Sequence, residues 1–522
     1  MKRWLVIVLC FVLPFAALKA QPAPHPADPQ IRDLVEQVNA DSIFATITRL
    51  AGFHTRHTYS DTTSDSSGIG AALRWVRAKV QNYDTAGRIS VEWFPWVGNF
   101  QGNPTTRHIL IARASGAPDD EARYIIGGHL DSRTVDISNN TGIAPGADDN
   151  GSTSAALLEL IRILPDSFAH NLEVIWFTGE EQGLWGSAAY VQHLVQQSAR
   201  VDGMIAMDMI SHIALSNGAI DTTSLRLYAQ GDFNQGGTGS VSRNLQRYLK
   251  WVGESYADID SFEMRPFPAT DRPGRGSDHM SFSQAGYPAV RVIERNEDTN
   301  FQHNPNDTPD HLSPTYARRI AMCTFGAMLT MLSAPPRPAA PLVEQIAPDR
   351  VRVTIPDSVA LPEQGHFYLT KRLWLSSFFD EIIDRGTERV TEYAVITGET
   401  YGYSYSRADS LDRPSPFSEE IVLDILPANE PHELLPAETQ ITASPNPFNA
   451  EVSFTLELAE NSHIALDVFD LLGRHVTTLA DDARSAGTYH IPWSPHDLAS
   501  GIYLARLLTD DEVYITKVAY VR

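Results

Sequence analysis

Short apolar and β-branched runs alternate with longer segments of helical period between about residue 30 and residue 332. The short runs indicate buried strands, and the longer segments indicate helices that pack against them. The predicted strands are 108–114, 122–130, 171–178, 201–209, 224–230 and 287–294. The predicted helices include 151–164, 186–198, 239–256 and 314–332. This alternation predicts an α/β domain over residues 29–332 with a largely parallel sheet.

The pattern changes at a proline-rich segment, SAPPRPAAP at residues 333–341. Helical periodicity is scarce from 342 to 426, and the stretch TYGYSYSRAD places three tyrosines on one face of a strand, Tyr401, Tyr403 and Tyr405. We therefore predict a small β-sandwich over 342–426. Because few contacts usually cross a linker of this kind, the α/β domain should fold without the sandwich.

A second break at residues 427–438 precedes another alternating segment, 441–522. Its apolar positions recur at every second residue in Ile464, Leu466 and Val468, which predicts the buried face of a strand. We expect this segment to fold as a separate all-β domain.

The N-terminus has the composition of a signal peptide. Lys2 and Arg3 precede the apolar run WLVIVLCFVLPFAAL, and a small residue, Ala20, follows at a suitable cleavage point. A membrane anchor is the alternative, but the run is shorter than the ~20 residues that span a bilayer. We predict that residues 1–20 are a signal peptide, that the protein is exported and that nothing spans the membrane after cleavage.

The cysteine content limits the possible disulfides, and the net charge limits the classes of binding partner. Cys10 lies in the predicted signal peptide, so Cys323 remains alone and the mature protein forms no internal disulfide. The formal net charge of −23 argues against nucleic acid and anionic membranes as partners, because both attract basic surfaces.

Histidines and carboxylates recur at or just after the predicted strand ends. Each motif alone has an ordinary explanation, such as a surface turn or a helix N-cap. Because ligands of an open parallel sheet bind at the carboxyl ends of its strands, together they predict one site. The candidates are His129, Asp131, Asp148, Asp149, Glu180, Glu181, Asp208 and His303.

This set of side chains suits divalent metal ions. Imidazoles and carboxylates without thiolates favour borderline ions, with zinc the best fit. Two ions a few ångströms apart can share one carboxylate, hold a water molecule and polarise a carbonyl. One further carboxylate should stay free of metal to take the proton of that water.

The motifs GGHLDS, PGADDNGS, FTGEEQGLWGS, AMDM, GSDHMSF and HNPNDT resemble those of the co-catalytic di-zinc aminopeptidases of the bacterial leucyl aminopeptidase type. Relatives of that family include glutamate carboxypeptidases and glutaminyl cyclases. The resemblance covers roughly residues 30–332. It implies that two Zn²⁺ ions bind to five residues, with Asp149 as the bridge, His129 and Asp208 at one site, and Glu181 and His303 at the other.

The same resemblance implies roles for the neighbouring residues. Glu180 would be the general base, and Asp131 would orient His129 through a contact outside the metal site. The peptide bond between Asp149 and Asn150 is often cis in this family. Asp278 and His279 match a family segment but receive no ligand role.

The β segments have resemblances of their own. Residues 342–426 are similar to a fibronectin type III sandwich, which is a match of fold alone. Residues 441–522, with SPNPFNAEVSF and LASGIYLARL, resemble the C-terminal sorting domains of exported bacterial proteins. This implies secretion machinery as a partner of 441–522. A stability or adhesion module is the alternative.

Together these features predict an exported zinc metallopeptidase that removes N-terminal residues from peptide substrates. A glutaminyl cyclase with one zinc is an alternative on the same scaffold. A carboxypeptidase acting on acidic dipeptides needs an arginine-rich pocket, for which Arg272 and Arg275 are available. A binding domain without activity would be expected to lack ligands, and here all are present.

Overall fold

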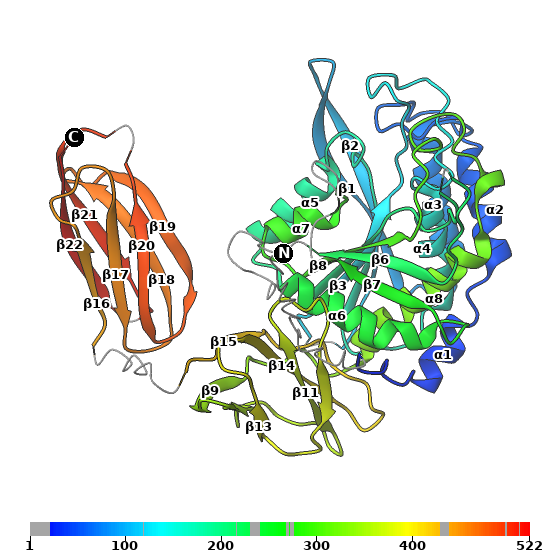
Figure 1. Ribbon diagram of the computed structural model, residues 1–522. Coiled ribbons are helices and arrows are strands. Elements are labelled where there is room, and N and C mark those ends of the chain that lie inside the picture. The colour runs from blue at the N-terminus through cyan, green and yellow to red at the C-terminus, as the bar shows by residue number, and fades with distance from the viewer. Residues whose placement is uncertain are drawn as a thin grey trace, which may run out of the picture. The chain divides into compact units, whose positions relative to one another are not determined.

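The computed structural model describes residues 21–521 except 118–119, 216, 230–240, 268–270, 272–275, 428–437, 496–497 and 511 (Figure 1). The predicted signal peptide, residues 1–20, therefore lies outside the described residues, as do Arg272 and Arg275. The chain divides into two compact units, Met1–Ile425 and Leu426–Arg522, which are described separately below.

An eight-stranded sheet forms the centre of the first unit, in the order β1-β2-β4-β3-β5-β8-β6-β7. Its middle strands β4, β3, β5 and β8 are parallel, whereas the pairings β1–β2, β2–β4 and β6–β8 are antiparallel. The strands are β1 (Ile89–Phe100), β2 (Asn103–Ala114), β3 (Arg123–His129), β4 (Asn171–Phe177), β5 (Gly203–Met207), β6 (Ser224–Ala229), β7 (Glu263–Phe267) and β8 (Ala289–Glu294).

Helices cover both faces of the sheet (Figure 1). Alternate residues of a strand point to opposite faces; on β3, Ile126 packs with the larger group of helices, whereas Ile125 packs with α5 and α7. The helices are α1 (Pro29–Val35), α2 (Ala40–Ala51), α3 (Gly68–Tyr83), α4 (Gly151–Ile163), α5 (Trp185–Gln196), α6 (Val241–Gly253), α7 (His279–Gln284) and α8 (Pro314–Ser333).

The predicted α/β class is confirmed. The six predicted strands correspond to β2, β3, β4, β5, β6 and β8, and the four predicted helices to α4, α5, α6 and α8. Helix α8 shows why its limits were readable: Ser313 accepts a hydrogen bond from the amide of Tyr316 as the N-cap, and Pro314 occupies the first turn.

Helices α1 to α3 lie outside the predicted set. Helix α3 begins with Gly68 and Gly70, residues that usually indicate a loop. A Cβ atom at Gly70 would lie 2.4 Å from the carbonyl oxygen of Thr62. The glycine is therefore required by a close tertiary approach, which the local pattern does not reveal.

Two antiparallel sheets follow the α/β domain, β13-β10-β9 and β12-β11-β14-β15. The three tyrosines predicted to share a strand face are buried together between them, which confirms the β prediction. The strands are β9 (Leu342–Ala347), β10 (Arg350–Thr354), β11 (His366–Leu373), β12 (Glu381–Asp384), β13 (Val390–Ala394), β14 (Thr400–Ala408) and β15 (Ile421–Asp424).

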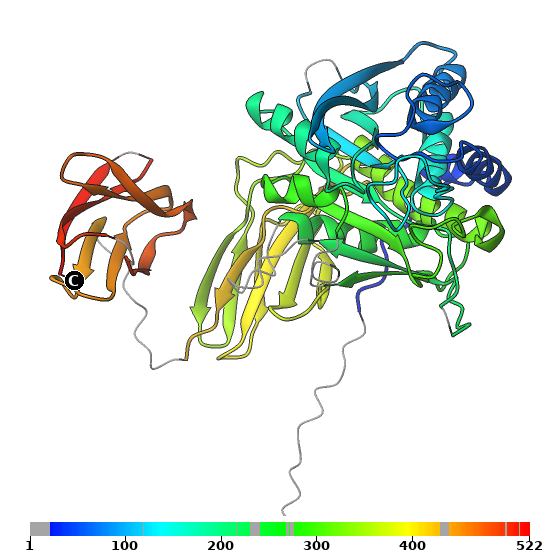
Figure 2. The ribbon, with the colours of Figure 1, turned by 90° about the horizontal axis from the view of Figure 1, so that it is seen from above.

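The expectation that few contacts cross the proline-rich segment is wrong. Trp251 of α6 packs against Phe417 and Tyr368, with ring centroids 5.3 and 5.0 Å apart. Tyr248 donates a hydrogen bond to the carbonyl of Pro414 over 2.7 Å. The four-stranded sheet lies against α6 in both views (Figures 1 and 2). The segment 333–341 therefore joins two bodies that pack against each other instead of separating them.

A buried ion cluster stabilises this interface. Arg372 donates two hydrogen bonds of 2.6 Å to the carboxylate of Glu420, and both side chains are fully buried. Arg247 of α6 lies 3.5 Å from the same carboxylate. Burial lowers the pKa of Arg247 to about 9, and Glu420 opposes that effect. One carboxylate therefore compensates guanidinium groups from both sides of the interface.

We expect Glu420→Ala to lower the free energy of unfolding of the first unit by about 3–5 kcal/mol, because it removes a buried carboxylate that faces the guanidinium groups of Arg247 and Arg372. Denaturant unfolding of the purified protein measures this loss. The control is Glu392→Ala, which removes a partly exposed partner of Arg352 and should cost less than about 1 kcal/mol. Equal losses in the two variants would contradict the importance of the buried cluster.

The second unit contains two more antiparallel sheets, β16-β17-β20 and β19-β18-β21-β22. Ile464, Leu466 and Val468 are fully buried in its core, as predicted. Its strands are β16 (Gln440–Ser444), β17 (Val452–Leu458), β18 (Ser462–Asp470), β19 (His475–Arg484), β20 (Gly487–Trp493), β21 (Gly501–Leu508) and β22 (Val513–Tyr520).

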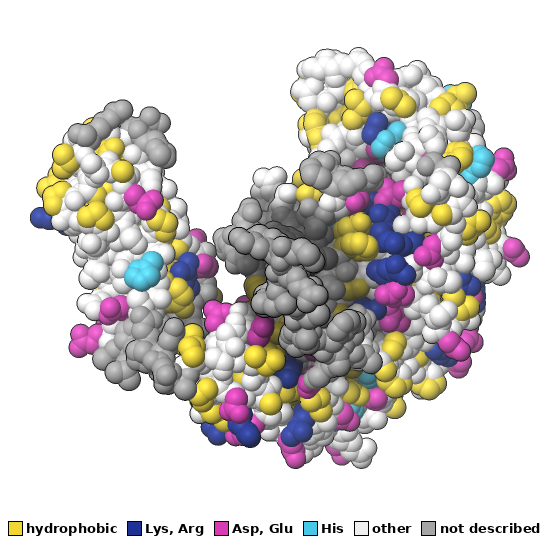
Figure 3. Space-filling model, viewed as in Figure 1, with side chains coloured by type: hydrophobic (Ala, Val, Ile, Leu, Met, Phe, Trp, Pro, Cys, Tyr) yellow, Lys and Arg dark blue, Asp and Glu magenta, His cyan; other side chains and the backbone are white. Residues whose placement is uncertain are grey.

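Charged side chains of both signs are mixed on the face shown in Figure 3, where Asp and Glu lie among Lys and Arg. Among the described residues, no helix has both the length and the apolar character needed to cross a membrane.

Candidate metal centre

The parallel middle of the sheet brings the predicted ligands together at one edge. His129 is the last residue of β3, Glu181 follows β4, and Asp208 directly follows β5. Asp149 lies just before α4, and His303 lies in the loop after β8. Because β4, β3, β5 and β8 run in the same direction, their carboxyl ends meet at this edge.

The two glycines before His129 allow β3 to occupy the centre of this arrangement. A Cβ atom at Gly127 would lie 2.6 Å from the carbonyl oxygen of Ile175, and one at Gly128 would lie 2.5 Å from that of Met207. Any other residue would displace the neighbouring strands, so the motif GGH serves the spacing of the strands that carry the site.

Five side chains form two groups that share Asp149. In the first group, His129 Nε2 lies 3.3 Å from Asp149 Oδ1 and 3.4 Å from Asp208 Oδ1. In the second, His303 Nε2 lies 3.1 Å from Asp149 Oδ2 and 3.3 Å from Glu181 Oε2. Within each group the ligand atoms lie within 4.8 Å of one another. The two oxygens of Asp149 thus face different histidines.

The turn that carries Asp149 is held by residues distant in the chain. Asp307 accepts hydrogen bonds from the amides of Asp148 and Asp149 over 2.8 and 3.1 Å. Asn150 donates to the carbonyl of Met207 and accepts from the amide of Met209, so it ties this turn to the end of β5. The peptide bond between Asp149 and Asn150 is cis, as the family resemblance implied.

Asp131 lies beside His129, as predicted, but the closer contact uses its backbone. The carbonyl oxygen of Asp131 lies 3.0 Å from His129 Nδ1, whereas its carboxylate lies 3.7 Å away. The carboxylate accepts a hydrogen bond from the hydroxyl of Thr58 over 2.9 Å. With Nδ1 occupied in this way, Nε2 of His129 is directed at the carboxylates.

Sequence reasoning missed two arginines that contact the ligands. Arg133 donates over 2.7 Å to Glu181 Oε2 and over 2.7 Å to His303 Nδ1. Arg291, buried in the apolar strand β8, lies 2.9 Å from Asp208 Oδ2. A charged residue inside the run YPAVRVIE was the available signal for Arg291, since such a residue is rarely buried without a partner.

The charges of the cluster shift the pKa values of its members. Burial alone would lower the pKa of His303, but hydrogen bonds to Asp149 and Glu181 raise it to about 10. Burial likewise opposes the charged form of His129, yet Glu180, Asp149 and Asp208 raise its pKa well above the ordinary value. Hydrogen bonds from both histidines lower the pKa of Asp149 against the effect of burial. The acidic ligands therefore provide a strongly negative environment for a cation.

Glu180 belongs to neither ligand group of the described residues, although it precedes Glu181. Burial raises its pKa well above the ordinary value, His129 opposes this, and the charges of Asp208 and Glu181 add to it. Asp278 and His279 are buried nearby and are also outside both groups. Burial raises the pKa of Asp278 to about 7, with His129 opposing it.

The nitrogen and oxygen atoms of the five proposed ligands are arranged as a zinc ion requires. Each group offers one imidazole nitrogen and carboxylate oxygens that already face one point, and zinc prefers such nitrogen and oxygen ligands. His129 can donate its other ring N–H, on Nδ1, to the carbonyl oxygen of Asp131, an arrangement that orients metal-binding imidazoles.

Residues 110–328 match peptidase family M28. A probable zinc metalloprotease of Pyrenophora tritici-repentis is 32% identical over 346 residues, which cover 60% of this chain and 78% of that protein. The chain belongs to peptidase family M28.

Other relatives and one solved structure match this chain over part of their own length. A probable zinc metalloprotease of Pyrenophora teres f. teres is 34% identical over 58% of this chain, and the match spans 66% of that protein's length. Leucine aminopeptidase 1 of Blastomyces gilchristii is 30% identical over 57% of this chain and 72% of its own length. The LapA aminopeptidase of Legionella pneumophila has a similar solved structure, with 21% identity, a TM-score of 0.45, and coverage of 60% of this chain and 78% of LapA.

Residues 443–520 of the M28 peptidase match the secretion system C-terminal sorting domain. The match lies within the second compact unit and indicates export or attachment to the cell surface.

Proposed function

We propose that this M28 peptidase is an aminopeptidase that holds two zinc ions and removes N-terminal residues from peptides. The observation that carries the proposal is the pair of ligand groups that share Asp149, with Glu180 adjacent in sequence to the ligand Glu181. The name of the Blastomyces gilchristii relative supports the choice of an aminopeptidase over other peptidases.

The residues divide the work as follows. His129, Asp149 and Asp208 would hold one ion, and Asp149, Glu181 and His303 the other. When bound, zinc supplies positive charge that polarises the scissile carbonyl and stabilises the negative charge that develops on it. Glu180 takes the proton of the attacking water, because it carries a carboxylate that no ligand group uses. Asp131 positions His129 through its backbone carbonyl, and Arg133 holds Glu181 by a hydrogen bond.

Hydrolysis of a panel of L-aminoacyl-p-nitroanilides, with and without a chelator, tests this function. We expect release of p-nitroaniline that stops with the chelator and returns when zinc is added. Either alternative activity would contradict the proposal. Ammonia release from peptides with N-terminal glutamine would indicate a glutaminyl cyclase, and release of C-terminal glutamate would indicate a carboxypeptidase. Absence of all three activities from the metal-loaded protein would contradict an enzymatic function.

We also propose that residues 342–426 form a fibronectin type III-like sandwich and that residues 441–522 address the enzyme to secretion machinery. The buried core of the second unit and the sorting-domain match support the second assignment. The alternative for residues 441–522 is an adhesion or stability module, and the following experiment distinguishes this from the sorting role.

Deleting residues 441–522 in the native host should trap the enzyme in the periplasm with its peptidase activity intact, because the ligands all lie in the first unit. Activity in the periplasm and in the medium measures this outcome. Unchanged activity in the medium would contradict the sorting role. Continued secretion with reduced activity on long peptides would indicate a substrate-binding module instead.

A further inference from the structure

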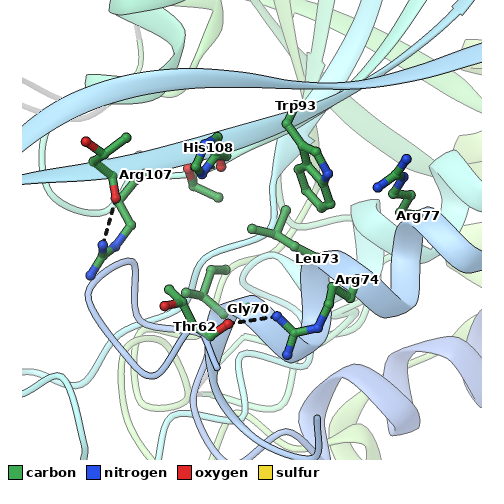
Figure 4. A pocket seen from close by; sticks show the side chains of 11 residues that line it. Thr62, Gly70, Leu73, Arg74, Arg77, Trp93, Arg107 and His108 are labelled. Carbon is green, nitrogen blue, oxygen red and sulfur yellow. Dashed lines mark hydrogen bonds between the residues drawn. The ribbon is translucent and has the colours of Figure 1, made fainter. Parts of the chain in front are cut away.

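A pocket of about 400 Å³ lies between α3 and the hairpin β1–β2, apart from the ligand groups (Figure 4). Leu73, Arg74 and Arg77 line it from α3, and Trp93 and His108 line it from the strands. None of the five proposed metal ligands is among its lining residues. The proposed peptidase function does not use this pocket.

The lining is basic although the protein carries a net charge of −23. Arg74, Arg77, Arg107 and His108 all contribute to it, and its described lining contains no Asp or Glu. Arg74 is already engaged, since it donates to the carbonyl of Thr62 over 2.7 Å and lies 3.1 Å from Asp65. Arg77 and Arg107 differ from Arg74 in their partners.

Within the described part of the chain, neither Arg77 nor Arg107 has a carboxylate within ion-pair distance. Arg107 donates to the backbone carbonyls of Thr58 and Thr106 over 2.7 and 2.8 Å. Nε of Arg77 is buried with no hydrogen-bond partner among the described residues. Its guanidinium lies 5.5 Å from the centre of the Trp93 ring. Two cations without a carboxylate partner therefore line the pocket, at opposite ends of it (Figure 4).

The surroundings of Arg107 show the same imbalance of charge. Burial lowers the pKa of Arg107, and burial together with Arg107 lowers the pKa of His108. An anion in the pocket would relieve this unfavourable positive charge and would gain charge-assisted hydrogen bonds from the arginines.

The remaining walls are apolar. Trp93 is partly buried, and Leu73 and Ile69 are buried residues of the core that reach the pocket. A ligand that fills the space would cover these side chains with an apolar group, which contributes about 25 cal/mol per Å² of area removed from water. Because the described lining offers no carboxylate, an ammonium group on the ligand would find no counter-ion there and would be repelled by the arginines.

We propose that this pocket binds an organic carboxylate that carries an apolar group and no ammonium, as the C-terminal residue of a peptide does. The carboxylate pairs with Arg77, which lies beside Trp93 at one end of the pocket, and the apolar side chain packs against Trp93 and Leu73 (Figure 4). Free amino acids should bind less tightly, since their ammonium group has no carboxylate partner in the described lining and is repelled by the arginines. The proposal does not depend on peptidase activity.

Calorimetric titration of the intact protein with N-acetyl-L-phenylalanine tests the proposal, with two matched probes. The carboxylate probe should bind at least about tenfold more tightly than N-acetyl-L-phenylalanine amide, which lacks the charge. It should also bind more tightly than free phenylalanine, which adds an ammonium. Equal binding of the three probes, or no binding of the carboxylate, would overturn the proposal without any variant.

Two further measurements place the probe. Arg77→Gln should weaken binding at least about tenfold, whereas Arg350→Gln, which removes the same charge from an exposed side chain of β10, should not. Equal affinity of the wild type and Arg77→Gln would overturn the site. Binding should persist after chelation of metal, and its loss there would place the carboxylate on the metal centre and overturn the proposal.

Discussion

Replacing Glu180 with alanine is expected to lower turnover of an aminoacyl-p-nitroanilide by about 10²–10⁴-fold while the zinc content stays unchanged. The reason is that Glu180 belongs to neither ligand group although it interacts electrostatically with His129, Asp208 and Glu181, which leaves its carboxylate for proton transfer. Burial, together with the charges of Asp208 and Glu181, raises its pKa, which favours a group that accepts a proton readily. Its loss therefore removes the chemical step and leaves metal binding in place.

The matched comparison is Glu181→Ala, in the adjacent position. Glu181 lies 3.3 Å from His303 and belongs to the second ligand group, so its replacement should lower both the zinc content and the activity. Steady-state kinetics together with metal analysis of each purified variant separates the two roles. Near-normal turnover in Glu180→Ala would show that another carboxylate takes the proton.

Replacing Asp149 with alanine is expected to remove both zinc ions from the protein. Each group would fall from three ligands to two, fewer than the three or four that protein zinc sites require. Activity should be lost with the metal. Asp208→Ala is the control, because Asp208 contributes only to the group that contains His129. It should lower the zinc content by one ion per chain.

Metal analysis of dialysed protein measures both outcomes, and circular dichroism shows whether each variant is folded. A wild type with two ions per chain, a folded Asp149→Ala variant with none and an Asp208→Ala variant with one would agree with a shared bridge. A single ion per active wild-type chain would contradict the two-metal proposal. Two ions retained by Asp149→Ala would exclude it as the bridge.

The elements that carry the site were predictable from the sequence because their signals are local. Strand β3 and helix α4 follow from apolar period alone, and both were predicted within a residue or two. Parallel strands end at one edge, so His129 and Asp208 were expected together although 79 residues separate them. This topological rule gave the set of candidate residues, whereas the choice of five ligands among them came from the family resemblance.

Other features depended on contacts that no local pattern encodes. Asp307 accepts hydrogen bonds from a turn 158 residues earlier, and Arg133 contacts His303 across 170 residues. The same holds for α6. Its helical pattern was predicted, but not that Tyr368 of β11 and Phe417 would cover it. Proline-rich composition limits backbone conformation, but it does not decide whether the bodies on either side attract each other.

The amino-acid sequence by itself thus determined the α/β class, the strand ends and the residue types available for metal. The tertiary structure alone decided which arginines neutralise the ligands, how closely the β-sandwich packs on α6, and that Arg77 and Arg107 face one pocket. The physical reason is that periodicity reports which side of an element avoids water. Which partner covers that side, and which charges meet there, is set by the packing of segments distant in the chain.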